Sequence, residues 1–431
     1  MTQATTGPMV AAAALDAAAV ARISETTGEP DWLCDVRRSW AERAESIDWP
    51  TGQEEEWRRT SLEKLPRDVA LLDASEVTVE REGLDERLAE RGVIFTDLAT
   101  AAVEHRDVLS AHLGLDPTLP SHARIWALAH AGWTAGTFCY VPAGVRVDGL
   151  LRVRITQRRA DAGFLPLTVM VAERDSAVTL LEEFESPDGE PGWFGGVAEV
   201  RALDGARVRY ANLQRLGDAV WNLGTQRFWV GKDADVTSLN GEVGSSVTKL
   251  GLDVQMAGNG GTSKLLGLLA AGDDQHIDIN SVQDLAGSHT TSDLLYLAGL
   301  YDRAKAAFYG MLRVQPQARA TSSYQECRNL LLSPEASAEP IPALEILTND
   351  ILRCGHGATA GAIDPVQRFY AQSRGLDPEA AERMIVRGFF EQVISRIESE
   401  PIRARMLSAL APRIGRADVD GDEAVAAEAA A

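Results

Sequence analysis

A repeat of 28 residues is the feature of this sequence that most restricts its fold. Short β-type runs, separated by Gly, Asp and Asn, begin near Ala206, Ala234, Thr262, Thr290 and Ala318. A second series lies about halfway between them, at Val220, Val247, His276, Ala304 and Leu332. Two strands per repeat, with turns and no helix between them, predict stacked β coils, and a parallel β-helix fits best. A sandwich or barrel is not expected to hold a constant repeat over five units.

Helical patterns flank this β region on both sides. Before it, Trp32, Val36 and Trp40 follow helical spacing. After it, Asp364-Pro365 and Asp377-Pro378 are typical helix starts, because Asp caps the first turn and proline is tolerated there. We therefore expect a mainly β chain between two helical regions. The predicted segments are a disordered or frayed start (1–28) that becomes helical near Leu15, an N-terminal helical or α+β domain (29–120), the β-helix (121–361), a C-terminal helical domain (362–416) and a disordered acidic tail (417–431).

Composition excludes several classes of protein. A net charge of −21 argues against a general nucleic-acid surface, since phosphate binding relies on clustered Lys and Arg. The chain has no run of roughly eighteen apolar residues, the length that a membrane span needs. The N-terminus lacks the positive region of a secretory signal, and the four scattered cysteines do not form a disulfide framework. We expect a cytoplasmic protein with free thiols.

The stretch Leu344–Tyr370 marks the change from strand to helix, and Cys354 and His356 lie within it. Their spacing of two places both side chains on one face of an extended backbone. A thiol beside an imidazole can bind soft metals or handle sulfur, although both residue types are also common structural residues. The flanking Gly355 and Gly357 indicate a close backbone approach by a neighbouring chain or ligand.

The sequence resembles the SufB/SufD family of iron–sulfur cluster assembly proteins, and within it the SufD branch. The resemblance covers roughly residues 29–400. The segments that carry it are Glu54–Leu62, Phe138–Val145, Asn329–Leu332, Leu344–Ile346, Cys354–Asp364, Phe369–Gly375 and Ala381–Phe389. SufB proteins have Glu-His-Glu-Ala-Thr where this chain has Cys-Gly-His-Gly-Ala-Thr, which favours the SufD branch.

This resemblance implies a right-handed parallel β-helix and a non-catalytic subunit. It implies a SufB-like partner bound through the β-helix and a SufC-like ATPase bound through the C-terminal helices, where Ile385, Phe389 and Val393 share an apolar face. It also places His356 and Cys354 at the interface where a transient iron–sulfur cluster is built, with His356 as a metal ligand shared with the partner subunit. The isolated chain is then expected to hold no cofactor.

Several points stay open from the sequence. Flavin binding, a homodimer of the isolated chain, and the role of Cys327 are undecided. No Gly-x-x-x-x-Gly-Lys-[Ser/Thr] motif is present, so ATP chemistry is expected in a partner.

Two other functions compete with this interpretation. β-Helices also occur in polysaccharide-cleaving enzymes, in which stacked carboxylates act as acid and base. The acids that could form such a site are Asp273, Asp274, Asp278, Asp284 and Asp293, although aspartate is common in turns. The other alternative is a purely structural β-helix platform in which Cys354 and His356 only pack.

Overall fold

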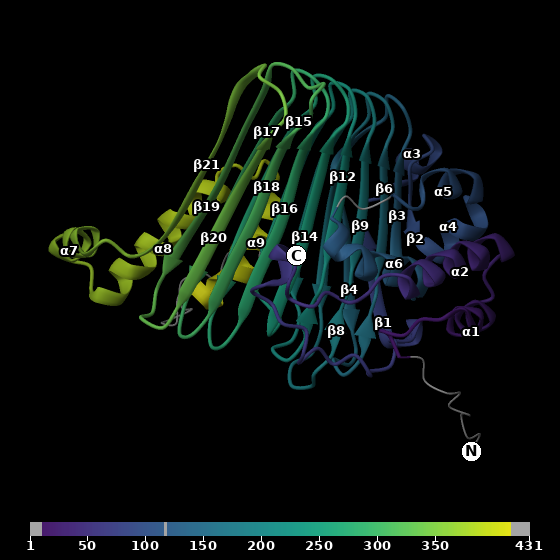
Figure 1. Ribbon diagram of the computed structural model, residues 1–431, viewed down its shortest axis with the longest axis horizontal. Helices are drawn as coiled ribbons and strands as arrows, with labels where there is room; N and C mark the ends of the chain where they lie inside the picture. The colour runs from purple at the N-terminus through teal and green to yellow at the C-terminus, as the bar shows by residue number, and fades with distance from the viewer. Residues whose placement is uncertain (1–10, 116–118, 415–431) are drawn as a thin grey trace.

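A computed structural model describes residues 11–115 and 119–414 and shows a parallel β-solenoid of about eight turns between an N-terminal helical region and C-terminal helices in the chain (Figure 1). The mainly β fold predicted from the repeat is thereby confirmed. The long strands of the nine-stranded sheet are β1 (Val77–Glu82), β4 (Arg146–Gln157), β7 (Ala177–Glu185), β10 (Arg207–Arg215), β13 (Asp235–Glu242), β15 (Thr262–Ala271), β17 (Thr291–Leu300), β19 (Thr321–Leu331) and β21 (Ile351–Ala362). None of the described helices is both long and apolar enough to cross a membrane.

A twelve-stranded sheet forms the opposite wall. It contains β2 (Ile94–Asp97), β3 (Gly136–Val141), β6 (Leu167–Ala172), β9 (Val197–Ala202), β12 (Thr225–Val230), β14 (Val247–Met256), β16 (His276–Leu285), β18 (Lys305–Val314) and β20 (Ser337–Ile346). Three two-residue strands, β5 (Gly163–Phe164), β8 (Trp193–Phe194) and β11 (Trp221–Asn222), run beside it and join it at β14. The early coils therefore have three strands and the later coils have two.

The repeat is less regular than the sequence suggested. Strand register advances by 28 residues from Arg207 to Asp235 and by 27 from there to Thr262. It then advances by 29 residues to Thr291 and by 31 to Ser322. The expectation of a constant period is wrong for these late coils, where the turns lengthen while the strands keep ten or eleven residues. Leu332, expected to begin a strand, lies in a turn before β20.

One corner of the solenoid contains a column of residues in the left-handed backbone region. Their φ values lie between 50° and 74°, and each N–H donates to a carbonyl oxygen of the next coil at 2.7–2.9 Å. The donors are Gly144, Asp175, Gly205, Asp233, Gly260, His289 and Ala320. Glycine and aspartate suit this conformation better than bulky residues, which explains their recurrence at the turns.

The first coil is closed by strands from the predicted N-terminal domain. β1 pairs antiparallel with β4, and β2 pairs antiparallel with β3. Six helices precede the solenoid or cover its first coils: α1 (Ala17–Thr27), α2 (Asp31–Glu45), α3 (Glu86–Glu90), α4 (Leu98–Glu104), α5 (Arg106–His112) and α6 (Ala123–Gly132). Outward side chains such as Phe138 and Val169 pack with Ile125 and Trp126 of α6 in one buried cluster. The outer face of the twelve-stranded sheet is therefore covered at this end.

The start of the chain is more ordered than predicted in its described part. Within the segment 1–28, residues 17–27 form α1, where Asp16 accepts a hydrogen bond from Ala19 N, and Gly28 ends the helix with φ 64°. Leu15 and Val20 are buried in the N-terminal cluster, which explains why this part is not frayed. Residues 1–10 and the predicted tail 417–431 lie outside the described residues.

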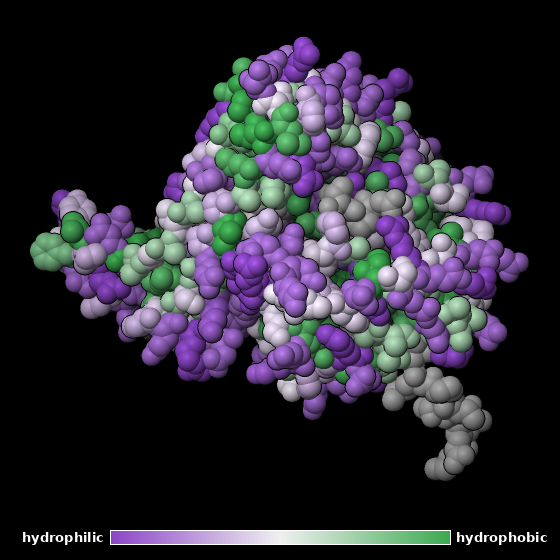
Figure 2. Space-filling view, in the orientation of Figure 1, coloured by the Kyte–Doolittle hydropathy of each residue, from purple (hydrophilic) through white to green (hydrophobic). Residues whose placement is uncertain are grey.

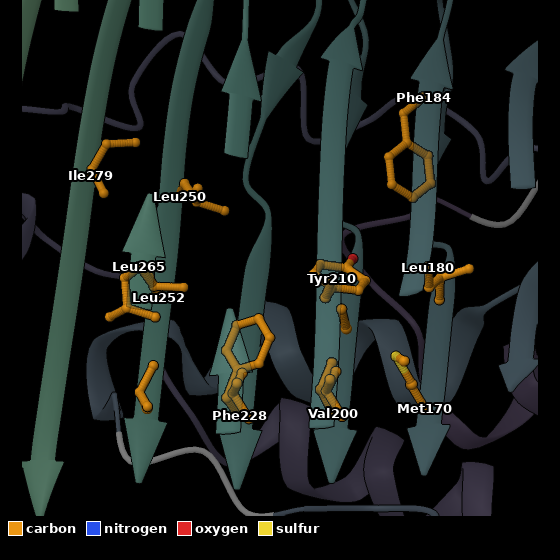
Figure 3. Close-up of a cluster of buried hydrophobic side chains, with 14 of the residues drawn as sticks. Met170, Leu180, Phe184, Val200, Tyr210, Phe228, Leu250, Leu252, Leu265 and Ile279 are labelled. Atoms are coloured by element: carbon orange, nitrogen blue, oxygen red, sulfur yellow. The ribbon is translucent and has the colours of Figure 1, made fainter. Parts of the chain in front are cut away.

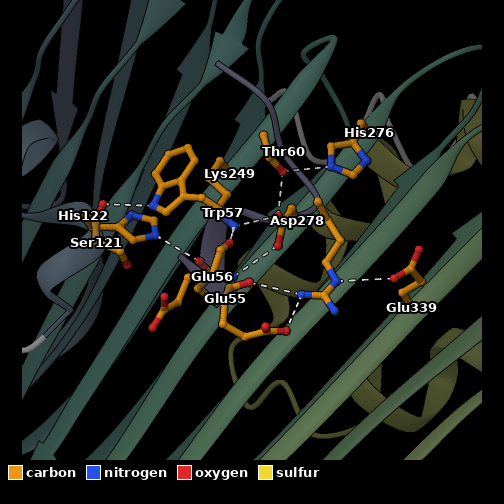
Figure 4. Close-up of polar contacts among 12 residues, drawn as sticks. Glu55, Glu56, Trp57, Thr60, Ser121, His122, Lys249, His276, Asp278 and Glu339 are labelled. Atoms are coloured by element: carbon orange, nitrogen blue, oxygen red, sulfur yellow. Dashed lines mark hydrogen bonds and ion pairs between the residues drawn. The ribbon is translucent and has the colours of Figure 1, made fainter. Parts of the chain in front are cut away.

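A segment that we call the strap, residues 49–67, runs across the outer face of the twelve-stranded sheet (Figure 4). Trp57 of the strap is buried and donates through Nε1 to Ser121 O at 2.9 Å. Beneath it Lys249 pairs with Asp278 at 2.6 Å, and Thr60 donates to the same carboxylate at 2.6 Å. The segment Glu54–Leu62, which carries part of the family resemblance, is thus anchored to the solenoid.

The C-terminal helices are α7 (Pro365–Ser373), α8 (Pro378–Ile394) and α9 (Glu400–Ile414). As predicted, Asp364 and Asp377 cap α7 and α8, and each helix begins with proline. α8 and α9 pack on the outer face of the nine-stranded sheet, whereas α7 contacts mainly α8. Arg405 of α9 also reaches the buried carboxylate of Glu183, at 3.3 Å.

Candidate functional site

The last coil, β20 and β21, is the part of the solenoid that no further described strand covers. β20 pairs only with β18, and β21 pairs only with β19. Each strand therefore presents one free edge of backbone N–H and C=O groups. An open edge of this length is a template for an additional strand, so it is an interaction site unless something blocks it.

Cys354 and His356 present their backbone groups at the free edge of β21. In a parallel ladder successive residues direct their backbone groups alternately to the two sides. Ser322 N donates to Thr290 O in the preceding coil, so Ser323 faces β21 instead. Ser323 is in register with Cys354, so the backbone N–H and C=O groups of Ser323 bond to the residues just before and just after Cys354. The even-numbered residues of β21, including His356, consequently face outward.

The side chains of these two residues lie on the inner side of the strand, at the mouth of the solenoid. Cys354 is half-buried and packs against the interior cluster, and burial raises the pKa of its thiol. His356 is exposed and lies in register with Gln325, whose amide bonds to the interior hydroxyl of Ser281. The structure thus brings together the two residues that the sequence singled out.

Tyr324 of the preceding coil lies against both glycines around His356. A Cβ atom on Gly357 would approach the Tyr324 hydroxyl to 2.9 Å, which is too close, whereas one on Gly355 would lie at an ordinary contact distance of 3.5 Å from the ring. The guanidinium carbon of Arg353 lies 4.2 Å from the centre of the same ring. A close approach was predicted here, but the group that makes it is a side chain of this chain.

The free edge of β20 differs from that of β21. Ser337 N and Leu347 N donate to the preceding coil, so the even-numbered residues of β20 face the edge. Two of these are Pro340 and Pro342, which have no N–H. A strand added at the middle of β20 would lose two hydrogen bonds, whereas β21 contains no proline along its length.

An apolar patch surrounds the turn between β20 and β21. Figure 2 shows hydrophobic residues gathered at the upper end of these strands. Its exposed members are Leu344, Ile346, Leu347 and Leu352, and Leu352 is 74% exposed. Apolar side chains gathered in this way on a solvent-exposed face are typical of protein–protein contact sites. The patch continues the open edges and belongs to the same candidate site.

The C-terminal helices place their apolar residues differently from the prediction. Val393 is fully buried against the nine-stranded sheet, and Ile385 and Phe389 are half-buried beside it. Val393 therefore has no surface for a partner while α8 is docked. The exposed large apolar side chains of these helices are Val366, Phe369, Tyr370 and Met384. Three of them belong to α7, which projects from the solenoid (Figure 1).

Metal binding has no ready centre in the described residues. No group of three or more His, Cys, Asp or Glu side chains there could hold a metal ion. Cys327, undecided from the sequence, is buried in the solenoid, and burial raises the pKa of its thiol to about 12. A buried neutral thiol is a poor metal ligand, because the thiolate is the binding form.

The acids considered for polysaccharide cleavage are scattered. Asp273 occupies a turn with φ 54°, and Asp274 pairs with Arg303 at 2.6 Å. Asp278 is bound beneath the strap, and Asp284 accepts a hydrogen bond from Gln315 at 2.6 Å. Asp293 lies on β17, in the other sheet. These five carboxylates do not form a common site.

Sequence reasoning missed the backbone of the last coil and the exposed face of α7. Predicting the free edge requires knowing which strands come last and to which side the backbone groups of each residue point. A period-two pattern gives neither. Pro340 and Pro342 were an available signal, since alternate prolines in a strand mark an edge.

Comparison with known proteins finds relatives over almost the whole chain. The family described as SUF system FeS cluster assembly, SufBD core domain, matches residues 154–389. The iron-sulfur cluster assembly protein SufD of Bacillus subtilis is 26% identical over 420 residues, which cover 91% of this chain and 96% of that protein. SufB of the same organism is 27% identical over 326 residues, covering 75% of this chain and 70% of SufB. A SufBD family protein of Mycobacterium leprae is 27% identical over 374 residues, covering 85% of this chain and 91% of that protein.

Proposed function

We propose a function from one premise: this chain belongs to the SufB/SufD family of iron–sulfur cluster assembly proteins and is most like SufD. The chain is the SufD-like, non-catalytic subunit of an assembly complex. In this role it pairs with a SufB-like subunit and, through that pair, helps to build a cluster from iron and sulfur. The cluster is cargo of the complex and not a resident cofactor of this chain.

The open last coil is the observation that carries this proposal. β21 offers an unblocked edge of twelve residues, and the apolar patch around Leu352 adjoins it. A SufB-like solenoid that ends in a similar edge can add its last strand to β21 through main-chain hydrogen bonds. The prolines of β20 direct the pairing toward β21, since a strand added at β20 makes fewer bonds.

Cys354 and His356 then lie at the centre of the subunit interface. Both residues point to the mouth of the solenoid, and His356 is accessible to a partner. Imidazole and thiol are suitable ligands for iron or sulfur, but two such groups are too few to hold a cluster alone. The remaining ligands therefore come from the partner subunit.

The exposed face of α7 and Met384 supports a second contact, with a SufC-like ATPase. Phe369 is 71% exposed, and no described element packs over it. A projecting helix with exposed aromatic residues fits a groove on another protein. The predicted ATPase site on these helices therefore moves from Val393 to this face.

Purification of the tagged full-length chain from its own cells tests the proposal. We expect a SufB-like chain and an ATPase to copurify, and the complex to contain iron and sulfide. His356→Ala should leave the subunits together but reduce cluster content at least about tenfold, with His105→Ala as a control on a helix boundary far from the site. Recovery of the chain without partners would refute the proposal, and normal cluster content in His356→Ala would favour a purely structural platform.

A further inference from the structure

A small cavity lies inside the solenoid, between the two sheets, in the coils that contain β7, β10, β12 and β13. Its volume is about 20 Å³. Phe184, Tyr210 and Leu250 contribute to its lining, and Figure 3 shows these side chains directed into the interior. One water molecule needs roughly 10–15 Å³ of such space, so the cavity has room for one.

Gln226, one of the lining residues, has an unsatisfied acceptor. Its Nε2 atom donates to Asn240 Oδ1 at 2.6 Å, which fixes the orientation of the amide. Its Oε1 atom has no hydrogen-bond partner among the described residues, although the side chain lines the cavity and is only 4% exposed. A buried acceptor without a partner costs roughly 1–3 kcal/mol, so the site favours a donor.

Glu242 supplies a second polar group to the same cavity. It accepts a hydrogen bond from Asn222 Nδ2 at 3.2 Å, and Asn222 Oδ1 in turn accepts from Gly224 N at 3.0 Å. Burial raises the pKa of Glu242 to about 8, so its carboxyl group is mainly protonated at neutral pH. A protonated carboxyl has a hydroxyl donor, and this donor needs an acceptor within the cavity.

We propose that this cavity is a binding site for one water molecule, which donates to Gln226 Oε1 and accepts from Glu242. Water matches the site because it supplies one donor and one acceptor and fits the volume. A metal cation does not match, since Glu242 is protonated and both oxygens of Glu182, the other acid of the lining, already accept hydrogen bonds from Thr168 and Tyr210. This inference concerns the interior of coils far from the open end and does not depend on the proposed function.

A high-resolution crystal structure of the full-length chain tests the proposal directly. We expect electron density for one water within hydrogen-bond distance of Gln226 Oε1 and Glu242. An empty cavity would overturn the proposal, and so would density for an ion with shorter, more numerous contacts. This measurement uses the natural chain, so it does not depend on whether a variant folds.

Water oxygen-17 relaxation dispersion on two variants gives an independent test. Ala198→Val adds a larger side chain to the cavity lining, and we expect it to remove one long-lived water per chain and to lower the melting temperature. Ala271→Val makes the same change at an interior position outside the lining and should leave the count unchanged. An unchanged count in Ala198→Val, or a higher melting temperature from filling a dry cavity, contradicts the proposal.

Discussion

The first and last coils of the solenoid differ in how far other parts of the chain cover them. At the first coil, α3 and the antiparallel strands β1 and β2 close the interior, and the described N-terminal helices pack over the neighbouring strands of the twelve-stranded sheet. At the last coil, β20 and β21 keep their edges free and expose residues such as Leu352. The first end is thus covered by the chain's own helices, and the last end is the one that our proposal assigns to a partner. Stability should therefore depend on the first end and assembly on the second.

The largest expected difference comes from the same substitution made at both ends. Leu151→Ala in β4 removes a fully buried side chain and should lower the free energy of unfolding by about 2–5 kcal/mol. Leu352→Ala in β21 removes an exposed one and should change it by less than about 0.5 kcal/mol. Urea unfolding of the two variants measures both values. Equal losses would show that the last coil is as well covered as the first.

An effect of comparable size, spread over several pH units, concerns Glu242 in the solenoid interior. Because burial raises its folded pKa to about 8, above the ordinary value of 4.5, its protonated form stabilises the fold at low pH. This contribution should be lost as the pH rises from about 4.5 to 8, by at most about 1.4 kcal/mol per pH unit. We expect Glu242→Gln to remove this slope in unfolding curves taken across the range. Glu335→Gln, at an exposed turn near the open end, is the control and should retain the slope.

A pair of proline substitutions in β21 distinguishes the N–H groups at the free edge from those that bond to β19. Ala358→Pro removes an N–H that faces the free edge, and we expect it to weaken binding of the SufB-like partner about tenfold. Thr359→Pro removes an N–H that faces β19 and should destabilise the isolated chain by about 1 kcal/mol or more. Titration calorimetry and urea unfolding measure the two effects. The assignment of edge-facing residues is wrong if the two variants exchange their behaviour.

The smallest effect on stability is expected on the projecting helix. Phe369→Ser should change the free energy of unfolding by less than about 0.5 kcal/mol, since the side chain is mostly exposed. It should nevertheless reduce binding of the SufC-like ATPase about tenfold or more in a pull-down or calorimetric assay. Val393→Ser provides the contrast, because it should destabilise the docking of α8. Normal ATPase binding by a stable Phe369→Ser chain would exclude this face.

The sequence predicted the solenoid because a strand repeat leaves a periodic trace even when individual coils vary. It did not predict the lengthened turns of the late coils. The length of a turn depends on the local backbone conformation and not on the periodic apolar residues of the strands. The closing strands β1 and β2 were also missed. Each is short and pairs with residues forty or more positions away, so no local pattern predicts the pairing.

The candidate site was predicted in part. The spacing of Cys354 and His356 placed both at the end of the β region, where the structure has them. The apolar face of α8 was recognised, but periodicity alone does not tell whether such a face packs inward or meets a partner. The contacts of Val393 with the nine-stranded sheet decide the question for that residue.

The strap has a consequence for the order in which this protein reaches its final form. Thr60 meets Asp278, which lies 218 residues later in the chain, and Arg59 meets Glu339, 280 residues later. At roughly 5–20 residues per second, a ribosome makes Asp278 roughly 10–40 s after Thr60. The strap therefore cannot dock on the nascent chain until the strands that contain Asp278 and Glu339 have been synthesised. Closure of the strap is a late event of biogenesis, although its residues are among the first to leave the ribosome.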